Sequence, residues 1–301
     1  MIDTNNEWIV SRSGIKERRI AAEEQATSDM AVIAARRALD CAGITADEVE
    51  LIMVATSSPD MLFPSTACIV QDKIGAKNAR AFDLSAGCTG FLYGVVIASQ
   101  FIATGCYSTV LVIGADTLSK MLNWEDRGTC VLFGDGAGAV ILKPVKQGTG
   151  IIASQIWSDG TCSSYLRLPA GGSRYPATQE TLDKKLHCLQ MNGKEMVQVA
   201  LKVMGKAIDQ LLIDAGLTSS DLNFLIPHQS NIKIIEALAN KLGLPMEKVM
   251  INIDRYANTA AASIPLALEE AVHNNRIKKG DHVAIASYGA GITWGGLILK
   301  W

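Results

Sequence analysis

The stretch AFDLSAGCTGF, residues 81–91, is the part of the sequence that decides the fold. A strand-like run leads into a short loop that carries Cys88, and an apolar helical run follows. The stretch NIDRYANTAAA, residues 252–262, follows the same plan and has Asn258 at the position that corresponds to Cys88. Two stretches with one plan in the same chain predict that the fold consists of two related halves.

Two further pairs of segments support this duplication. AGITADEVELIMVAT (42–56) resembles AGLTSSDLNFLIPHQ (215–229), because in each a helix ends at Ala-Gly and a turn and a buried strand follow. LFGDGAGAVIL (132–142) resembles SYGAGITWGGLIL (287–299), with two strands around a glycine-rich turn in each. Three pairs in the same order predict an internal duplication with a pseudo-twofold axis.

Strand-like runs alternate with helical patterns along the whole chain, which indicates an α/β fold with layered sheets. Strands are predicted at residues 50–56, 110–115, 130–134, 139–145, 223–228, 283–288 and 295–300. Helices are predicted at residues 28–43, where Ser28 is the expected cap, and at residues 194–216 and 230–243. The two halves are residues 1–150, which carry Cys88, and residues 151–301, which carry His228 and Asn258.

The composition excludes several classes of protein. The net charge of −2, from 28 basic and 30 acidic residues, gives no electrostatic footprint for nucleic acid. The seven cysteines are odd in number and form no CxxC motif, which argues against a disulfide framework or a structural zinc site and favours a reducing cytoplasm. Residues 84–115 carry no charge, but Gly105 and its polar neighbours interrupt them. This pattern predicts a central buried helix and then a strand, rather than a membrane span.

Three side chains are candidates for catalysis. Cys88 lies between two glycines at an expected helix N-terminus, where the helix dipole favours a thiolate, although an inert buried thiol fits the spacing equally well. His228 ends an apolar strand just before a helix, where α/β proteins place functional groups; a satisfied core histidine is the alternative. Asn258 heads a helix of small residues, where the alternative role is a helix cap.

Two glycine-rich segments lie between predicted strands, at residues 133–138 and 288–296. Neither matches a phosphate-binding pattern, so close backbone packing in a hairpin is the preferred interpretation. A backbone N–H group from Gly289–Gly291 is also a candidate for an oxyanion hole.

The sequence resembles a known enzyme family over nearly its whole length, from residue 3 to Trp301. The segments that carry the resemblance are DLSAGCTGFLYG, HQSN, YANTAAASIP, GAGITWG, EWIVSRSGIKERRIA, FPSTAC and WEDRGTCVLFGDGAGA. They are similar to β-ketoacyl-acyl-carrier-protein synthase III, the initiating condensing enzyme of bacterial type II fatty-acid synthesis. The resemblance implies a thiolase-like fold, with two pseudo-symmetric halves in a five-layered αβαβα arrangement, and a homodimer.

The resemblance also implies a reaction. Cys88 would take an acyl group from acetyl-CoA or a similar short acyl-CoA, and His228 and Asn258 would hold the thioester carbonyl of malonyl-acyl-carrier protein during decarboxylation. The products would be a 3-oxoacyl-carrier protein, carbon dioxide and CoA. Elongating relatives have a second histidine where this chain has Asn258, which favours the initiating class. No metal or bound cofactor is implied, because acyl-CoA and the phosphopantetheinyl carrier protein are substrates.

Further residues match positions that bind substrate in the family. Trp8 and Arg127 resemble a pair that sandwiches the adenine ring of CoA. Arg12 resembles a phosphate contact, and Asn231 a residue that lines the pantetheine tunnel. Phe63 resembles a residue that reaches into the acyl pocket of the partner subunit.

The glycine-rich turn and the helix after His228 complete the expected site. Tyr288 stands where relatives have an aromatic residue beside the primer, and the expected oxyanion turn follows as Gly289, Ala290 and Gly291. Lys233 and Lys241 are candidates for contact with the acidic carrier protein, although a solvated helix face explains them equally well.

One departure from the family pattern leaves alternatives open. Relatives usually begin with a strand some 25 residues before the segment that starts here at Asp3-Thr4, so the first strand of the N-terminal half, expected to be a central one, is absent from this sequence. Either the start is assigned too late, at an internal methionine, or the chain is truly short, and a short chain leaves a non-catalytic paralogue open. A separate alternative is a specialised relative that primes a polyketide or transfers acyl groups without decarboxylation.

Overall fold

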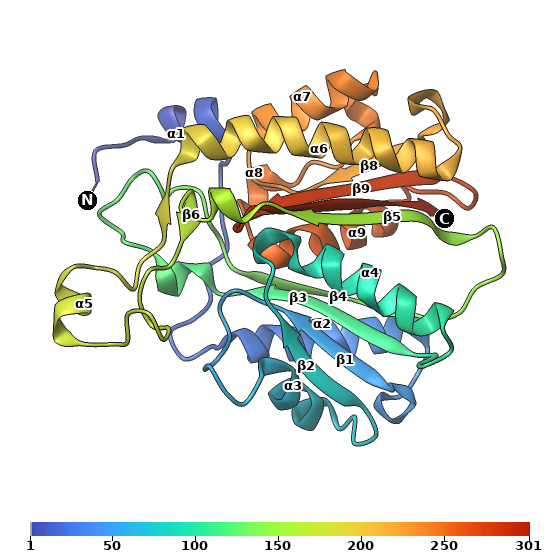
Figure 1. Ribbon diagram of the computed structural model, residues 1–301, viewed down its shortest axis with the longest axis horizontal. Helices are drawn as coiled ribbons and strands as arrows, with labels where there is room; N and C mark the ends of the chain where they lie inside the picture. The colour runs from blue at the N-terminus through green and yellow to red at the C-terminus, as the bar shows by residue number, and fades with distance from the viewer. Residues whose placement is uncertain (1) are drawn as a thin grey trace.

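The computed structural model describes residues 2–301, which form two four-stranded sheets and one short two-stranded ribbon (Figure 1). The first sheet has the order β2–β1–β3–β4, with β1 (Leu51–Ala55), β2 (Arg80–Leu84), β3 (Val110–Asp116) and β4 (Gly136–Leu142). The second has the order β5–β10–β9–β8, with β5 (Gly150–Ser158), β8 (Phe224–Pro227), β9 (His282–Gly289) and β10 (Thr293–Lys300). The ribbon pairs β6 (Leu166–Arg167) with β7 (Gln190–Met191).

Helices separate and cover the two sheets, so that the molecule has five layers (Figure 1). The outer face of the first sheet is covered by α2 (Thr27–Ala42) and α3 (Thr66–Ile74). Between the sheets lie α4 (Gly90–Ala103) and α9 (Ser263–His273), and the second sheet is covered by α6 (Gly193–Ala215) and α7 (Ile232–Leu242). The remaining α-helices are α1 (Asn6–Ser13), α5 (Gln179–Asp183) and α8 (Ile253–Tyr256). The layer order αβαβα is the one expected from the sequence.

The uncharged segment of the sequence becomes the centre of the molecule. Helix α4 packs against strands of both sheets, and Phe91 and Leu92 in its first turn are almost completely buried. Burying side chains of this size stabilises the fold by about 1.5–3 kcal/mol each. Every residue of β3, which follows the break at Gly105, is also buried. Among the described residues, no helix is long and apolar enough to span a membrane.

Four local predictions are wrong. Residues 130–134 are not a strand: Cys130 and Leu132 donate to carbonyls only three or four residues back, and Phe133 alone makes a bridge. The strand-like start of residues 252–262 is the short helix α8. Strand β5 was not among the predicted strands. Finally, Ser28 does not cap α2, because the N-cap is Ala26, whose N–H is satisfied by the carboxylate of Asp29.

The second half also corrects the place expected for the strand that relatives carry before the segment starting at Asp3-Thr4. Its own first strand, β5, lies at the edge of the sheet and pairs with β10, which corresponds to β4 in the duplication. The matching place in the first half is therefore the edge beside β4, not the centre. A groove of about 930 Å³ lies there, lined mainly by apolar residues of β4, α4 and α9. The central pair β1–β3 is complete, with five residues of each strand in register.

Candidate active site

Cys88 lies in a one-turn 3₁₀ helix, Gly87–Thr89, that leads directly into α4. Its side chain is buried, with the residue 6% exposed. Gly87 has φ +55, a left-handed conformation that residues with a Cβ rarely adopt. The cysteine is thus held at a sharp turn at the start of a helix, where the sequence predicted it.

The ionisation state of Cys88 differs from the prediction. Burial raises the pKa of the Cys88 thiol to about 12, and the carboxylate of Asp116 nearby adds to the rise. We expected the helix N-terminus to favour the thiolate. The loss of hydration and the negative charge of Asp116 both oppose the effect expected of the helix N-terminus. In the absence of substrate, Cys88 is a neutral thiol.

His228 follows the last residue of β8 and is 1% exposed. Its backbone N–H donates to the carbonyl of Ala286, but neither ring nitrogen has a hydrogen-bond partner among the described residues. Burial lowers the pKa of His228 to about 3, so the ring is neutral. A buried imidazole with two unpaired nitrogens is rare in folded proteins and indicates that a ligand completes its hydrogen bonds.

The ring of Tyr288 meets the His228 ring edge to face, with 5.6 Å between the centroids. The hydroxyl groups of Tyr288 and Ser230 are hydrogen-bonded at 2.8 Å. These contacts fix one side of the histidine ring and leave its nitrogens without a partner.

Asn258 is buried where the two halves meet. Its backbone N–H donates to Leu132 and its carbonyl accepts from Gly134, each at 3.0 Å. Its Oδ1 accepts from the N–H of Ala260 at 2.9 Å, in the 3₁₀ turn Ala260–Ala262 that leads into α9. The N-cap residue of that turn is Thr259 and no side chain caps it, so the capping role of the alternative interpretation does not fall to Asn258. Because Oδ1 is occupied by this local contact and Nδ2 makes no hydrogen bond within residues 2–301, the contact orients a free donor.

The turn between β9 and β10 lies directly over Cys88. A Cβ added at Gly289 would be 2.6 Å from the backbone nitrogen of Cys88, and one added at Gly87 would be 2.9 Å from that of Ala290. The hydroxyl of Ser287 donates to the carbonyl of Cys88 at 3.0 Å. Such contact requires glycine at both positions, and it brings the predicted turn 289–291 against the nucleophile turn.

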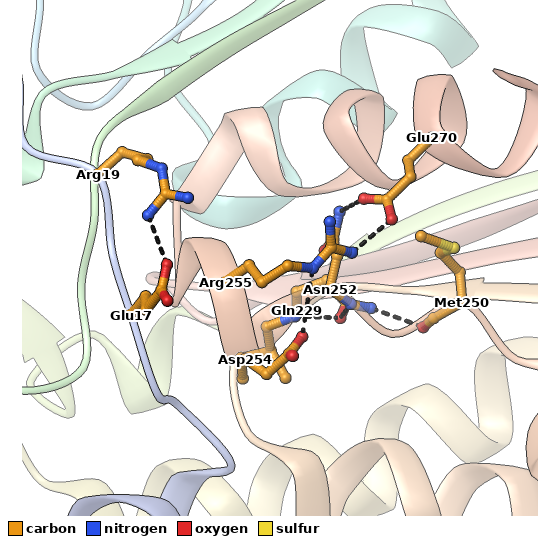
Figure 2. A network of polar contacts seen from close by, with 9 residues as sticks. Glu17, Arg19, Gln229, Met250, Asn252, Asp254, Arg255 and Glu270 are labelled. Carbon is orange, nitrogen blue, oxygen red and sulfur yellow. Dashed lines mark hydrogen bonds and ion pairs between the residues drawn. The ribbon is translucent and has the colours of Figure 1, made fainter. Parts of the chain in front are cut away.

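A polar network behind His228 and Asn258 was missed by the sequence analysis (Figure 2). The amide nitrogen of Gln229 donates to the carbonyls of Pro227 and Met250, and its oxygen accepts from the N–H groups at the start of α8. Arg255 of α8 pairs with Glu270 of α9 (Figure 2). The network ties the end of β8, which carries His228, to the helices that flank Asn258. Its only sequence signal is the glutamine next to the histidine in HQSN.

Four residues that resemble CoA contacts lie together. The guanidinium carbons of Arg12 and Arg127 lie 4.7 Å and 5.3 Å from the ring centroid of Trp8. Asn231 caps α7 through Oδ1 and donates from Nδ2 to the carbonyl of Arg12 at 3.2 Å. Trp8 packs against the apolar cluster that includes Cys88. An aromatic ring with two cations over it suits a phosphorylated, ring-bearing ligand.

Other predicted residues lie apart from this site. Phe63 is 84% exposed, in the loop before α3. Lys241 donates to both carboxylate oxygens of Asp209 on α6, at 2.9 and 2.7 Å, so its charge is already paired. Lys233 is exposed in the first turn of α7. Within residues 2–301, no group of three or more His, Cys, Asp or Glu side chains is arranged to hold a metal ion.

Comparisons with known proteins agree with this geometry. A family model described as 3-oxoacyl-[acyl-carrier-protein] synthase III matches residues 82–160, and the model of that family's C-terminal part matches residues 212–301. A β-ketoacyl-[acyl-carrier-protein] synthase III of Caldanaerobacter subterraneus is 54% identical over 301 residues, which is all of this chain and 91% of the relative. One of Desulfitobacterium hafniense is 52% identical, with the same coverage.

The solved structures agree in shape as well. The crystal structure of 3-oxoacyl-[acyl-carrier-protein] synthase III from Aquifex aeolicus superposes with a TM-score of 0.92 at 43% identity. The alignment includes the whole of this chain and 92% of the Aquifex aeolicus chain. The thiolase-like fold predicted from the sequence is confirmed by this likeness.

Proposed function

The chain belongs to the β-ketoacyl-acyl-carrier-protein synthase III family, and from that membership we propose that it condenses an acyl-CoA primer with malonyl-acyl-carrier protein to initiate fatty-acid synthesis. The observation that best supports this chemistry in the chain itself is the buried imidazole of His228, whose ring nitrogens have no hydrogen-bond partner among residues 2–301. The His228 ring packs edge to face with the ring of Tyr288. The next residue in the chain, Gly289, contacts the turn that carries Cys88.

The first step is acyl transfer to Cys88. The sulfur attacks the thioester carbonyl of acyl-CoA, a new carbon–sulfur bond forms, and CoA leaves as a thiol that carries the proton from Cys88. Because the thiol is neutral in the free protein, its proton must leave as the sulfur attacks. The backbone N–H groups of Cys88 and of the 289–291 turn, which packs closely on the Cys88 turn, are the candidates to stabilise the oxyanion.

The second step is decarboxylation of the malonyl group. The bond to the carboxylate breaks, carbon dioxide leaves, and the electron pair moves onto the thioester oxygen as an enolate. A neutral His228 has one ring N–H to donate, and Asn258 has its Nδ2. Donors fixed in a dry site contribute about 3 kcal/mol each to stabilising such an oxyanion. The enolate carbon then attacks the acyl-Cys88 thioester and releases the cysteine, which takes up a proton.

The substrates and the compartment belong to the same proposal. Acyl-CoA would bind along Trp8, Arg12, Arg127 and Asn231, with acetyl-CoA or another short acyl-CoA as primer and no bound cofactor. The acyl-carrier protein would deliver the malonyl group at the exposed Lys233, while Lys241 contributes less because Asp209 holds it. A cytoplasmic location agrees with seven cysteines that are all free in the structure.

The proposed function is tested by reconstitution. Purified protein is mixed with acetyl-CoA and malonyl-acyl-carrier protein, and the mass of the carrier protein is measured by intact mass spectrometry. We expect a 3-oxoacyl-carrier protein and one equivalent of carbon dioxide. Acylation without carbon dioxide release would favour an acyl-transfer relative. Neither product, with a panel of acyl-CoAs, would favour the non-catalytic paralogue.

We further propose that the protein is a homodimer that pairs through β2. This strand is at the edge of its sheet, and Phe82 on it is half-exposed. The neighbouring loop exposes Met61, Leu62 and Phe63, and Asp83 of β2 anchors α3 next to that loop by accepting from Thr66 and Ala67. An open edge with a contiguous apolar patch marks an interface. In such a dimer Phe63 would leave the solvent and enter the partner.

Replacing Phe82→Glu is expected to convert the dimer to a monomer, because a charge buried in the paired edge has no partner. Size-exclusion chromatography with light scattering measures the mass. Ile213→Glu is the matched control, since Ile213 is equally apolar but lies exposed on α6. A Phe82→Glu protein that keeps twice the mass of one chain would place the dimer contact elsewhere.

A further inference from the structure

Asp116 is a buried carboxylate beside the site, for which the proposed reaction has no role. It is the last residue of β3 and is 0% exposed. Burial raises the pKa of Asp116 to about 6, even though four hydrogen bonds to the carboxylate oppose the rise. A buried anion also makes the Cys88 thiolate harder to form. Some other benefit must therefore explain why a carboxylate is held at this place.

The two oxygens of Asp116 join the two halves of the molecule. Oδ1 accepts from the loop after β1, through Ser57 N–H at 2.7 Å, Ser58 Oγ at 2.8 Å and Thr56 Oγ1 at 3.2 Å. Oδ2 accepts from the N–H of Ala261 at 3.0 Å. The first set lies in the N-terminal half and the last in the C-terminal half.

Ala261 belongs to the turn whose first N–H group, that of Ala260, donates to the Asn258 side chain. The N–H of Ala260 is bound by Asn258 and the next N–H, of Ala261, by Asp116. Two consecutive donors at the start of the α9 helical segment are thus satisfied by one local amide and one carboxylate from the other half. The turn is also closely packed, because a Cβ added at Gly114 would be 2.2 Å from the carbonyl oxygen of Ala261.

We propose that Asp116 is a positioning residue for decarboxylation: it fixes the Ala260–Ala262 turn against β3, and so holds the Asn258 amide in place relative to Cys88. This inference rests on the proposed function of the same site. It assigns Asp116 to the half-reaction that uses Asn258 and not to the one that uses Cys88 alone.

Asp116→Asn tests the proposal with little change in volume. A carboxylate accepts at both oxygens, whereas an amide accepts at one and donates at the other. In the variant, the backbone N–H of either Ala261 or Ser57 points at the NH₂ group of the asparagine. Two donors then face each other, and one hydrogen bond of the carboxylate is lost. We expect carbon dioxide release from malonyl-acyl-carrier protein to fall about tenfold to a hundredfold per folded enzyme, the effect of a sub-ångström to 1 Å misplacement.

Acyl transfer is expected to respond differently in the same preparation. Removal of the negative charge lowers the pKa of Cys88, so iodoacetamide should alkylate Cys88 faster at mildly alkaline pH and acetylation by acetyl-CoA should not slow. Asp135→Asn is the matched control. Asp135 is also a buried carboxylate that accepts three hydrogen bonds, from Ser119 and Ala21, with none from the Ala260–Ala262 turn. The Asp135→Asn protein should be less stable than the wild type. Its rate of carbon dioxide release relative to its rate of acetylation should be unchanged.

An unchanged ratio of carbon dioxide release to acetylation in Asp116→Asn would overturn the inference. Loss of a merely structural aspartate lowers the folded fraction, and both rates then fall by the same factor. Should circular dichroism show that this variant does not fold, Ser58→Ala replaces it, since it removes one donor to the same carboxylate. Ser58→Ala should also lower the rate of carbon dioxide release relative to the rate of acetylation by acetyl-CoA. An unchanged ratio of these two rates in Ser58→Ala would overturn the inference as well. If the wild type itself neither acylates nor decarboxylates, the proposed function fails, which is a distinguishable result.

Discussion

Replacing Cys88→Ala is expected to abolish acylation of the protein by acyl-CoA and to lower condensation by at least about a thousandfold, the usual effect of losing a nucleophile. The turn that carries Cys88 depends on Gly87, Gly289 and backbone contacts, not on the sulfur, so the variant should fold. Intact mass after incubation with acetyl-CoA measures the adduct. The wild type should gain one acetyl group and the variant none.

Cys130→Ala provides the matched control for this experiment. Cys130 is also buried, at 3% exposed, and belongs to the same apolar cluster as Cys88. It should retain both the adduct and the activity. Decarboxylation of malonyl-acyl-carrier protein should survive in Cys88→Ala, because its donors are on other residues. An acetyl adduct that persists in Cys88→Ala would refute the assignment of the nucleophile.

Replacing His228→Ala is expected to lower carbon dioxide release and condensation by about a hundredfold to a thousandfold, the cost of one oxyanion donor. The ring makes no hydrogen bond to any residue that the structure describes, so its loss should lower the free energy of unfolding by only about 1–2 kcal/mol of packing. Release of labelled carbon dioxide measures decarboxylation, and thermal unfolding measures the free energy of unfolding.

His273→Ala is the control for the loss of a histidine, because His273 is exposed at the end of α9. It should change neither quantity. If His228→Ala unfolds instead of losing only activity, the histidine is structural. If it keeps the wild-type rate of decarboxylation, Asn258 and backbone donors suffice and the role proposed for His228 is wrong.

Much of the fold was predictable because its signals are local and occur twice. The paired stretches around Cys88 and Asn258, the uncharged run that becomes α4 and β3, and the Ala-Gly helix ends all depend on neighbouring residues. Layered sheets follow from burying the apolar faces that these patterns define, whereas the number of five layers was expected from the resemblance. One error came where distant contacts decide, at residues 130–134, where an apolar run forms turns beside Asn258 instead of a strand.

The duplicated α/β architecture could be predicted from sequence patterns alone, because spacing and residue type repeat in the two halves. Spacing left Cys88, His228 and Asn258 each with a structural alternative, and the resemblance to the family selected them. Only the tertiary structure decided the charge states of Cys88 and His228, since pKa values depend on how much water the whole fold removes. Only the tertiary structure paired Lys241 with Asp209, and only it brought Asp116 to Ala261, 145 residues away along the chain. These contacts join segments whose sequence patterns carry no sign of one another.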